Sequence, residues 1–363
     1  MPDEITRIVD LLVESRRNGF SHPDLIESVI TDLSSCINSE EFGHSIELLE
    51  TILKLRPPNL TNLFFDIHCP IFSPTPGTPT LHHLFHRLHS VCSTISSLVL
   101  LGNGGTYHGH MNDLIAALSS HLESLTLTHF TLDLGTYNAL RLCTSLREVS
   151  MNYIHADDGH CLPAIVQRWP NLRRFHYAYN LRGNLDSTVT CLSVSCLELE
   201  DFALVCNGFS SAVTTGGMMS FIDRCGAKRI RLAGISAVDD RLVFCTLLRG
   251  RRLEHLDLER SHHFMGSITP SRKESWPDLR SLSLLGCPYL CQEFVEKVAR
   301  ACPKLEEVVL PDHLNVGQNS CLSPFGFRRE QGNVWRKVAE MPSIRKNKGE
   351  IRGAMSRLIK RFK

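Results

Sequence analysis

The stretch from Leu279 to Leu310, LRSLSLLGCPYLCQEFVEKVARACPKLEEVVL, carries the pattern that decides the fold. It begins and ends with the same phrase, apolar-x-x-apolar-x-apolar, at 279–284 and 305–310. The alternating part of this phrase predicts a short β-strand, because successive side chains of a strand point to opposite faces. Between the two phrases, apolar residues such as Phe294 and Val298 recur at helical spacing. The stretch therefore predicts a strand, a helix and a second strand.

The same phrase occurs ten times along the chain. Neighbouring copies are separated by 24 to 28 residues, apart from a step of 35 residues between the first two. One strand and one helix cannot bury an apolar face alone, so the units must stack on one another. We therefore expect an α/β solenoid with parallel strands on its concave face and helices on its convex face. The copies begin at Leu60, Ile95, Leu122, Leu146, Leu172, Leu199, Ala227, Leu253, Leu279 and Leu305.

A second signal recurs at a fixed distance from the phrase. The residue three positions before the first apolar residue is cysteine in four copies and tryptophan in two. Proline follows this cysteine or tryptophan in three of the six copies. This pattern resembles the cysteine-containing class of leucine-rich repeats, over roughly residues 58–311. The resemblance implies a curved horseshoe and buried structural thiols. The residues concerned are Cys92, Cys143, Cys196, Cys302, Trp169 and Trp276, with Pro170, Pro277 and Pro303.

The chain divides into three parts on this basis. Residues 1–57 predict an N-terminal helical segment, with helices over 1–13, 25–33 and 44–55. Residues 58–311 form the solenoid, with a proline-rich inserted loop at 69–80 and an irregular polar loop at 261–275. Residues 312–363 form a basic C-terminal tail.

The opening of the chain resembles the first helix of an F-box, a helical module often fused to this repeat class. Pro2, Glu4, Ile5, Ile8, Leu11 and Leu12 carry the resemblance. The later F-box phrase, an apolar-Cys-basic-Trp-like stretch, has no counterpart between Arg16 and Pro58. Two interpretations stay open, a degenerate F-box and a generic amphipathic helix. The first implies that Pro2, Ile5, Ile8 and Leu12 contact the adaptor subunit of a ubiquitin ligase.

The two ends differ in charge. Residues 328–363 contain 12 Lys and Arg against 3 Asp and Glu, a net charge of +9, whereas residues 1–327 carry −8. Within this tail, Ile351, Met355, Leu358 and Phe362 lie on one face of a predicted helix. Such a segment is a solvated tail, or caps the acidic body, or contacts an anionic membrane or nucleic acid.

The composition excludes other classes. Lys and Arg number 39 and Asp and Glu 38, so a uniformly basic nucleic-acid binder is not expected. No apolar run approaches the roughly 18 residues of a membrane span, and the acidic N-terminus is unlike a secretory signal. The 14 cysteines are therefore interpreted as reduced thiols of an intracellular protein, cytoplasmic or nuclear.

Catalytic motifs are missing from the sequence. It contains no G-x-S-x-G, no phosphate-binding loop and no H-E-x-x-H. His82, His86 and His89 share one helical face but flank an apolar stripe, which favours a solvated face over a zinc site. The segments 102–105, 108–110 and 157–160 are interpreted as turns, and the cysteines as packing residues. We therefore predict no catalytic residue, no metal and no cofactor.

The concave face is the remaining candidate for function. Within each phrase, residues between the apolar positions point away from the core. The middle repeats place charged residues there, with Tyr179 nearby as an aromatic anchor. We predict that a protein partner contacts Glu148, Arg174, His176, Asp201, Arg229, Arg231, His255 and Asp257.

The resemblance implies the substrate-recognition subunit of a cullin-type (SCF) ubiquitin ligase, which holds its target on the repeats and raises its local concentration near the transfer machinery. The alternative is a stand-alone scaffold or adaptor protein with no ligase role. A zinc-dependent enzyme has only the histidines at 82–89 in its favour. A GTPase-activating module would be expected to end in an acidic tail, whereas this chain ends in a basic one.

Overall fold

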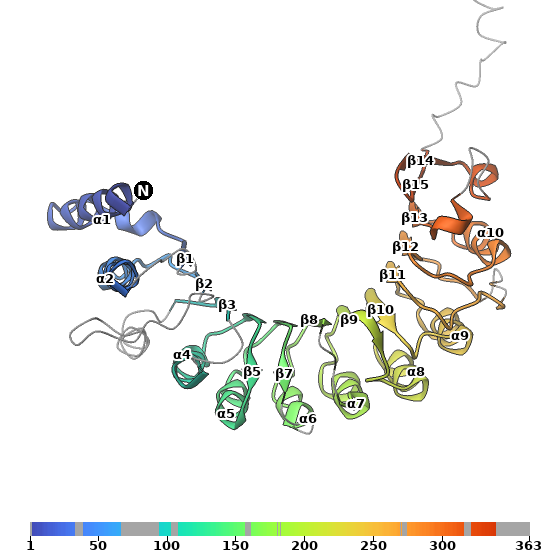
Figure 1. Cartoon of the computed structure of the whole chain (residues 1–363), viewed down its shortest axis with the longest axis horizontal. Coiled ribbons are helices and arrows are strands. Elements are labelled where there is room, and N and C mark those ends of the chain that lie inside the picture. Colours follow the sequence, from blue (N-terminus) through green and yellow to red (C-terminus); the bar gives the residue numbers. More distant parts are fainter. Residues whose placement is uncertain are drawn as a thin grey trace, which may run out of the picture.

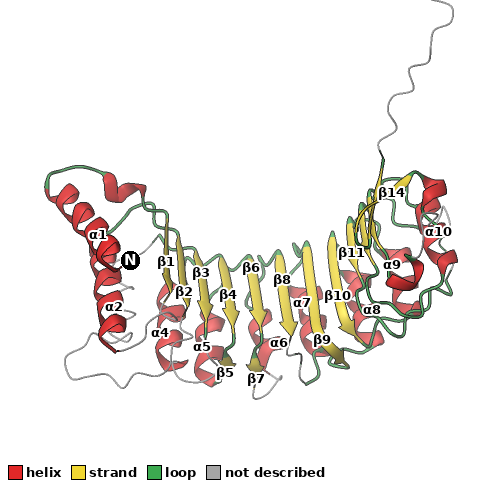
Figure 2. Ribbon diagram, turned by 45° about the horizontal axis from the view of Figure 1, so that its top comes forward, coloured by secondary structure: helices red, strands yellow, loops and turns green. Residues whose placement is uncertain are grey.

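The fold is a curved row of strand–helix units with the strands on the inner side and the helices on the outer side (Figure 1). The computed structural model describes residues 2–32, 39–66, 94–102, 108–156, 161–179, 181, 183–268, 270, 274–315 and 321–338. Thirteen strands form one continuous sheet, and the convex helices lie behind it (Figure 2).

Eleven of these strands run parallel, each joined to the next by one repeat. The equivalent apolar residues of neighbouring phrases lie directly opposite one another, as in the pairs Leu98–Leu125 and Leu125–Val149. In spatial order the parallel strands are β1 (Ser28–Asp32), β2 (Asn62–Asp66), β3 (Ser97–Leu101), β4 (Ser124–Thr128), β6 (Glu148–Asn152), β8 (Arg174–Tyr179), β9 (Asp201–Ser210), β10 (Arg229–Ile235), β11 (His255–Asp257), β12 (Ser281–Ser283) and β13 (Glu307–Val309). Two short strands, β5 (Thr131–Leu132) and β7 (His155–Ala156), form a separate parallel pair.

In three repeats, the convex helix begins at a residue whose side chain caps its first turn. Asp133, Thr214 and Asp239 each accept a hydrogen bond from the backbone N–H three residues later, which satisfies one unpaired donor of the first turn. Between β11 and β12 the described residues form no helix. The helices are α4 (His108–Leu118), α5 (Leu134–Leu142), α6 (Cys161–Val166), α7 (Asp186–Ser195), α8 (Thr215–Arg224), α9 (Asp240–Arg249) and α10 (Gln292–Ala301).

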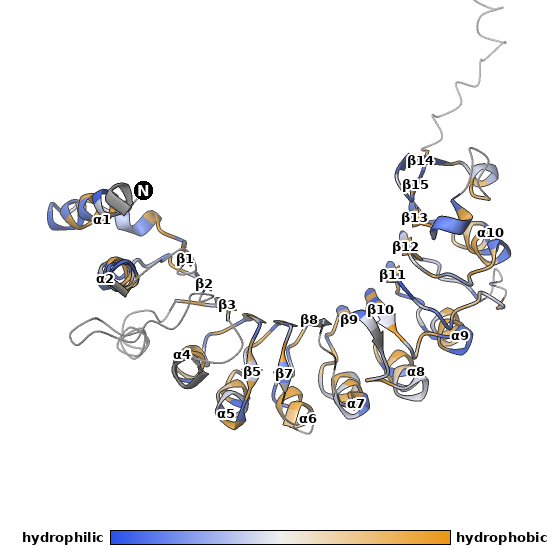
Figure 3. Ribbon diagram, viewed as in Figure 1, coloured by the Kyte–Doolittle hydropathy of each residue, from blue (hydrophilic) through white to orange (hydrophobic). Residues whose placement is uncertain are grey.

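The core lies between the sheet and the helices. All three apolar positions of all ten phrases are at most 4% exposed, and they belong to one buried cluster that runs from Val29 to Trp335. Helices such as α5 and α9 carry both apolar and polar residues, since only one side of each faces the sheet (Figure 3). The predicted α/β leucine-rich-repeat solenoid is therefore confirmed.

The cysteines that stand three residues before a phrase are packing residues. Cys143, Cys196 and Cys302 directly follow α5, α7 and α10 and are at most 2% exposed. Burial raises the pKa of the Cys143 and Cys196 thiols to about 12 and that of Cys302 to about 11. These thiols are therefore protonated and behave as small apolar groups. Cys92 lies outside the described residues.

The N-terminal segment differs from its prediction. Helices α1 (Pro2–Arg17) and α2 (Ser39–Lys54) cover the predicted helices at 1–13 and 44–55. The predicted helix at 25–33 is wrong, because that stretch forms the short 3-10 helix η1 (His22–Leu25) and strand β1. Its β-branched run, Val29-Ile30-Thr31, suits a strand and completes the open edge of β2, with Val29 opposite Leu63.

This segment is built into the solenoid. Ile46, Leu49 and Leu53 of α2 belong to the same buried cluster as the ten phrases. Strand β1 and helix α2 therefore make one further repeat ahead of the predicted boundary at residue 58. Helix α1 packs against α2 and η1 at the end of the row.

The C-terminal end also differs from its prediction. Part of the predicted tail forms a hairpin of β14 (Phe327–Gln331) and β15 (Val334–Lys337), which turns at Gly332 with a φ of +54°. Strand β15 pairs antiparallel with β13, so the hairpin covers the edge of the last parallel strand. Buried Trp335 donates a hydrogen bond to the side-chain oxygen of Asn315 at 3.0 Å.

Several predicted features are not covered by the structure. The inserted loop at 69–80 and the amphipathic helix over 351–362 lie outside the described residues. In the part of the chain that the structure describes, no helix is long and apolar enough to cross a membrane.

One strand interrupts the regular register. Ala233 of β10 lies opposite Val205 of β9, but Ile235 lies opposite Ser210, so β9 carries extra residues in a bulge. Gly234 faces this bulge with a φ of +69°. A Cβ atom at Gly234 would collide with the carbonyl oxygen of Cys206 and would lie 2.5 Å from that of Gly208.

The substitution Gly234→Ala is therefore expected to lower the free energy of unfolding by about 2 kcal/mol or more, through the clash and the left-handed backbone. Gly216→Ala is the matched control. Its Cβ would lie 3.8 Å from the nearest atom, and because alanine favours the helix α8 the change should be neutral or stabilising by up to about 1 kcal/mol. Urea unfolding of both variants measures the difference. Equal stabilities would contradict the close packing of the bulge on β10.

Candidate functional site: the concave face

The strand register brings the eight predicted partner-binding residues onto one face. Arg174, Arg229 and Arg231 are exposed, and the other five are half-buried. They form two rows that cross the strands. The first row consists of Glu148, Arg174, Asp201, Arg229 and His255, and the second contains His176, Arg231 and Asp257 with Ala203 between the first two. Their contact with a partner stays a prediction.

Most of these side chains pair with one another. Arg174 lies 2.8 Å from Glu148, and Arg231 lies 2.8 Å from Asp257. The exposed pair of Arg174 and Glu148 contributes only about 0–1 kcal/mol to stability, because water screens it, whereas the carboxylate of Asp257 is partly buried. The described residues give Arg229 no hydrogen bond or ion pair, although its charge acts on Asp201 and His255.

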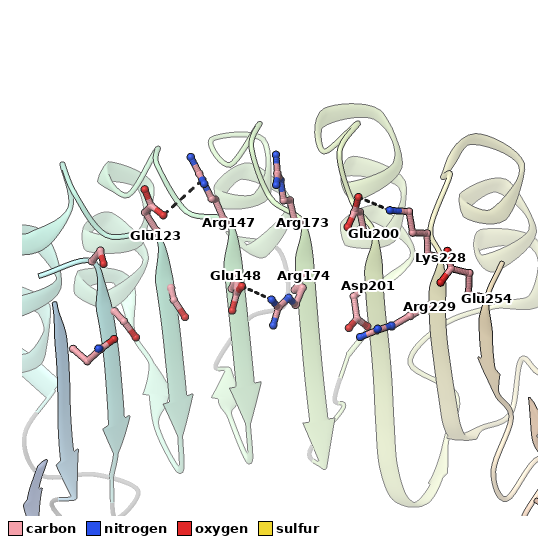
Figure 4. Close-up of a pocket in the computed structure, with 14 residues that line it drawn as sticks. Glu123, Arg147, Glu148, Arg173, Arg174, Glu200, Asp201, Lys228, Arg229 and Glu254 are labelled. Atoms are coloured by element: carbon pink, nitrogen blue, oxygen red, sulfur yellow. Dashed lines mark hydrogen bonds and ion pairs between the residues drawn. The ribbon is translucent and has the colours of Figure 1, made fainter. Parts of the chain in front are cut away.

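A third row was not predicted. The residue directly after the first apolar position of the phrase is charged in eight consecutive copies. The first six of these residues, from Glu123 to Glu254, lie along one edge of the concave face (Figure 4). Aligning the copies on their first leucine would have shown this row. Ion pairs join Arg147 to Glu123 at 3.7 Å and Lys228 to Glu200 at 2.9 Å. The row consists of Glu123, Arg147, Arg173, Glu200, Lys228, Glu254, Arg280 and Glu306.

Two hollows lie on this face. The first has a volume of about 730 Å³ and is lined almost entirely by charged and hydroxyl side chains of the first and third rows (Figure 4). The second has a volume of about 710 Å³ and lies nearer the carboxyl ends of the strands. Its lining includes the apolar residues Ala178, Ala203 and Val205 beside Tyr179. Arg229 lines both hollows.

A stack of aromatic rings leads to the second hollow. The rings of His129, Tyr153 and Tyr179, one from each of three consecutive repeats, are nearly parallel with 4.4 Å between neighbouring centroids. Tyr179 ends the stack and is 38% exposed. The sequence analysis singled out only Tyr179. All three residues stand seven positions after the first apolar residue of their phrase, so aligning the copies would have shown that they are neighbours.

All three ring-bearing residues have left-handed backbones, with φ values of +59°, +53° and +77°. This conformation costs a non-glycine residue about 1–2 kcal/mol, whereas one ring stack contributes about 0.5–1.5 kcal/mol. Two stacks therefore do not fully offset three strained residues. In later repeats Gly234 and Gly286 make the equivalent turn without this cost, whereas Arg260 adopts it with a φ of +56°.

Burial and charge shift the pKa values of three residues on this face. Burial acts to raise the pKa of Asp201, but the hydrogen bond from His176 and nearby arginines lower it overall. Burial and the charge of Arg229 lower the pKa of His255, so this imidazole is neutral at pH 7. Burial and the neighbouring carboxylate of Glu259 raise the pKa of Asp257 to about 6, despite its ion pair with Arg231.

The predicted adaptor-binding residues all lie in α1. The side chains of Pro2 and Ile5 are not described, Leu12 is half-buried, and Ile8 is 57% exposed. Leu11 beside them is 59% exposed, whereas Val9 faces inward and is 2% exposed. Helix α1 therefore presents apolar side chains to solvent.

The weaker candidate sites have little structural description. The histidines at 82, 86 and 89 and residues 157–160 lie outside the described residues. His108 and His110 begin α4, and Gly102 follows β3 directly. Within the described ranges, no three His, Cys, Asp or Glu side chains come together as metal ligands would.

The raised pKa of Asp257 predicts a pH-dependent stability. The folded state binds this proton more tightly than the unfolded chain, so the contribution of Asp257 to stability is fully present below about pH 4 and is lost as the pH rises through about 6. Asp257→Asn should therefore stabilise the protein at pH 8 by about 2 kcal/mol and have little effect at pH 4. Thermal or urea unfolding at both pH values measures this.

Asp278→Asn is the control for this prediction. Asp278 pairs with Lys304 at 2.6 Å on an exposed surface, and its substitution should change stability by less than about 0.5 kcal/mol. A loss of stability at pH 8 in Asp257→Asn would instead show that the ion pair with Arg231 outweighs the burial of the carboxylate.

Comparison with known proteins supports the architecture. No family model matches the sequence, and no curated protein matches it. A chain of the yeast Rad7–Elc1 complex is similar over 84% of this chain and 82% of its own length, at 14% identity and a TM-score of 0.56. The leucine-rich-repeat-containing protein LegL7 from Legionella pneumophila matches 82% of this chain and 96% of its own, at 12% identity and a TM-score of 0.43. At such identities the likeness concerns the fold alone, and the chain folds as a leucine-rich-repeat solenoid.

Proposed function

We propose that this chain is a non-catalytic recognition protein that binds a protein partner on its concave face. The observation that carries the proposal is the charged surface formed by six consecutive strands, β4 to β11, in three rows. Solenoids offer such an extended, curved face to macromolecular partners because each repeat adds one strip to it.

The energetics favour recognition over stability as the role of these charges. The ion pairs of the face are exposed, so they add little to folding, while the core is already complete beneath them. Ordered side chains of opposite charge instead select partner surfaces with a complementary charge pattern, since contacts between like charges are unfavourable. The proposed role of the rows is therefore selectivity for a partner of complementary charge pattern.

Charge reversal tests this proposal. In an affinity purification from cells that express the protein, the double variant Arg174→Glu, Arg229→Glu should lose the partners that the wild type retains. Arg249→Glu is the matched control, because Arg249 lies on the convex helix α9 and is 62% exposed. An unchanged set of partners on the double variant, with an unchanged melting temperature, would refute binding through the concave face.

A second candidate is the substrate receptor of a cullin-type ubiquitin ligase. The yeast neighbour in the comparison belongs to a complex of Rad7 and Elc1, which supports binding of a second subunit. Exposed Ile8 and Leu11 on α1 would provide an apolar contact for an adaptor. Against this role, β1 and α2 are part of the solenoid, whereas an F-box is a separate helical unit. The scaffold role is therefore preferred.

Size-exclusion chromatography of the purified protein with the purified ligase adaptor subunit separates the two roles. Under the scaffold proposal the two proteins elute separately. Co-elution that is lost in the double variant Ile8→Asp, Leu11→Asp would establish the ligase role instead. Both side chains are more than half exposed, so these substitutions leave the core intact.

A further inference from the structure

The second hollow has an apolar floor. Ala178, Ala203 and Val205 line it, and together with Ala233 they form a small buried cluster separate from the main core. Tyr179 stands beside them, and its ring is held by the aromatic stack with the two preceding repeats. The first hollow is lined almost entirely by charged and hydroxyl side chains. Of the two hollows, the second is therefore the one that can bury apolar groups of an occupant.

The two hollows also differ in charge. The lining of the first contains five carboxylates and five cations, whereas that of the second contains four carboxylates and two guanidinium groups. Asp257 and Glu259 share Arg231, at 2.8 and 3.5 Å. Burial and the nearby Glu259 raise the pKa of Asp257 to about 6 despite this ion pair. Arg336 pairs with Glu307 from outside the lining but does not remove the excess of carboxylates. The second hollow is therefore negative and favours a basic occupant.

The chain itself contains a segment with the matching chemistry. Residues 339–363, which lie outside the described residues, contain eight Lys and Arg against two Glu, a net charge of +6. The predicted helix within this segment has Ile351, Met355, Leu358 and Phe362 on one face, with basic residues between them. An apolar stripe flanked by basic side chains complements a hollow that has an apolar floor and an excess of carboxylates.

The end of β15 lies within reach of the hollow. The backbone N–H of Lys337 donates a hydrogen bond to the carbonyl oxygen of Glu306, which is followed by Glu307 of the lining. From β13 to Tyr179 on β8 the sheet advances by five strands, about 24 Å. Residues 339–350 can span up to about 40 Å, and a helix over the next twelve residues would cross about four strands. The segment is therefore long enough to dock in the hollow of its own chain.

We propose that the basic segment 339–363 docks in the second hollow of its own chain, with its apolar stripe over Ala203 and Val205 and its basic side chains beside Asp257 and Glu259. The inference rests on the proposed recognition function, because the docked segment occupies the surface that a partner would contact. Tethering gives the segment an effective concentration on the order of millimolar. A partner must displace the segment, so this contact lowers the apparent affinity of the concave face.

A fluorescein-labelled synthetic peptide of residues 339–363 tests the inference. A full chain with Arg345→Glu, Lys346→Glu, Lys348→Glu and Arg352→Glu, here called the released chain, should no longer hold its own segment in the hollow. By fluorescence polarisation, the peptide should bind the released chain at least tenfold more tightly than the wild type, in which the segment competes. Equal affinity for the two chains, or binding to neither, would overturn the inference.

Charge-matched substitutions in the released chain separate the hollow from general attraction to an acidic protein. Glu259→Gln with Glu307→Gln should weaken peptide binding at least tenfold, because both carboxylates line the second hollow. Glu123→Gln with Glu200→Gln removes the same charge from the first hollow and should change binding less than twofold. Equal weakening by the two pairs, at unchanged melting temperatures, would overturn the inference.

Carbodiimide cross-linking of the wild-type chain shows whether docking occurs within one molecule. This reagent joins a lysine to a carboxylate that it touches, so lysines of the segment should be linked to Asp257, Glu259 or Glu307. Glu293 on the convex helix α10 is the control, because its side chain is 70% exposed and should not be linked to them. In a mixture of isotope-labelled and unlabelled protein, each link should join peptides with the same label. Absence of links to the lining, or links that join the two labels and so identify a second copy as the occupant, would overturn the proposal.

Failure of these tests and failure of the proposed function are distinguishable. The recognition function stands without the docked segment if the Arg174→Glu, Arg229→Glu variant still loses its cellular partners. If that variant keeps its partners, the function is refuted whatever the peptide experiments show.

Discussion

The structure depends on one constraint, that no single repeat can bury its own apolar residues. A repeat with three inward-facing apolar positions needs neighbours on both sides, and the convex helix covers only the back of its strand. The buried cluster therefore runs unbroken from Val29 to Trp335. The strand at each end of the sheet has one edge without a parallel neighbour, and such a free edge can pair with other chains unless it is covered. At the C-terminal end the antiparallel hairpin of β14 and β15 covers the edge of β13, and at the N-terminal end α1 packs on α2 and η1.

The same stacking orders the surface. Equal repeat lengths place equivalent residues opposite one another, so a position in the phrase becomes a row across the sheet. Rows of charged side chains across the strands follow from this register. Irregularities in it are therefore informative. The bulge of β9 and the aromatic stack at 129, 153 and 179 both lie beside the second hollow, where the face changes from charged to apolar.

The integration of the N-terminal segment bears on function. An F-box acts as a separate module, whereas β1 is the first strand of the sheet and α2 lies over its core. Helix α1 at the end of the row exposes Ile8 and Leu11 to solvent.

The sequence by itself determined the repeat, the solenoid and the placement of the eight predicted residues on one face, because a strict spacing of apolar residues permits only one way to stack the units. It also contained the third charged row, which a closer alignment would have revealed. It did not identify β1 or the hairpin, since a terminal strand has no copy of the phrase and is stabilised by the edge it covers. Only the tertiary structure decided which charges pair, and that the rings of His129, Tyr153 and Tyr179, which share one repeat position, stack face to face. Those contacts depend on backbone turns and side-chain directions, which the spacing of leucines does not specify.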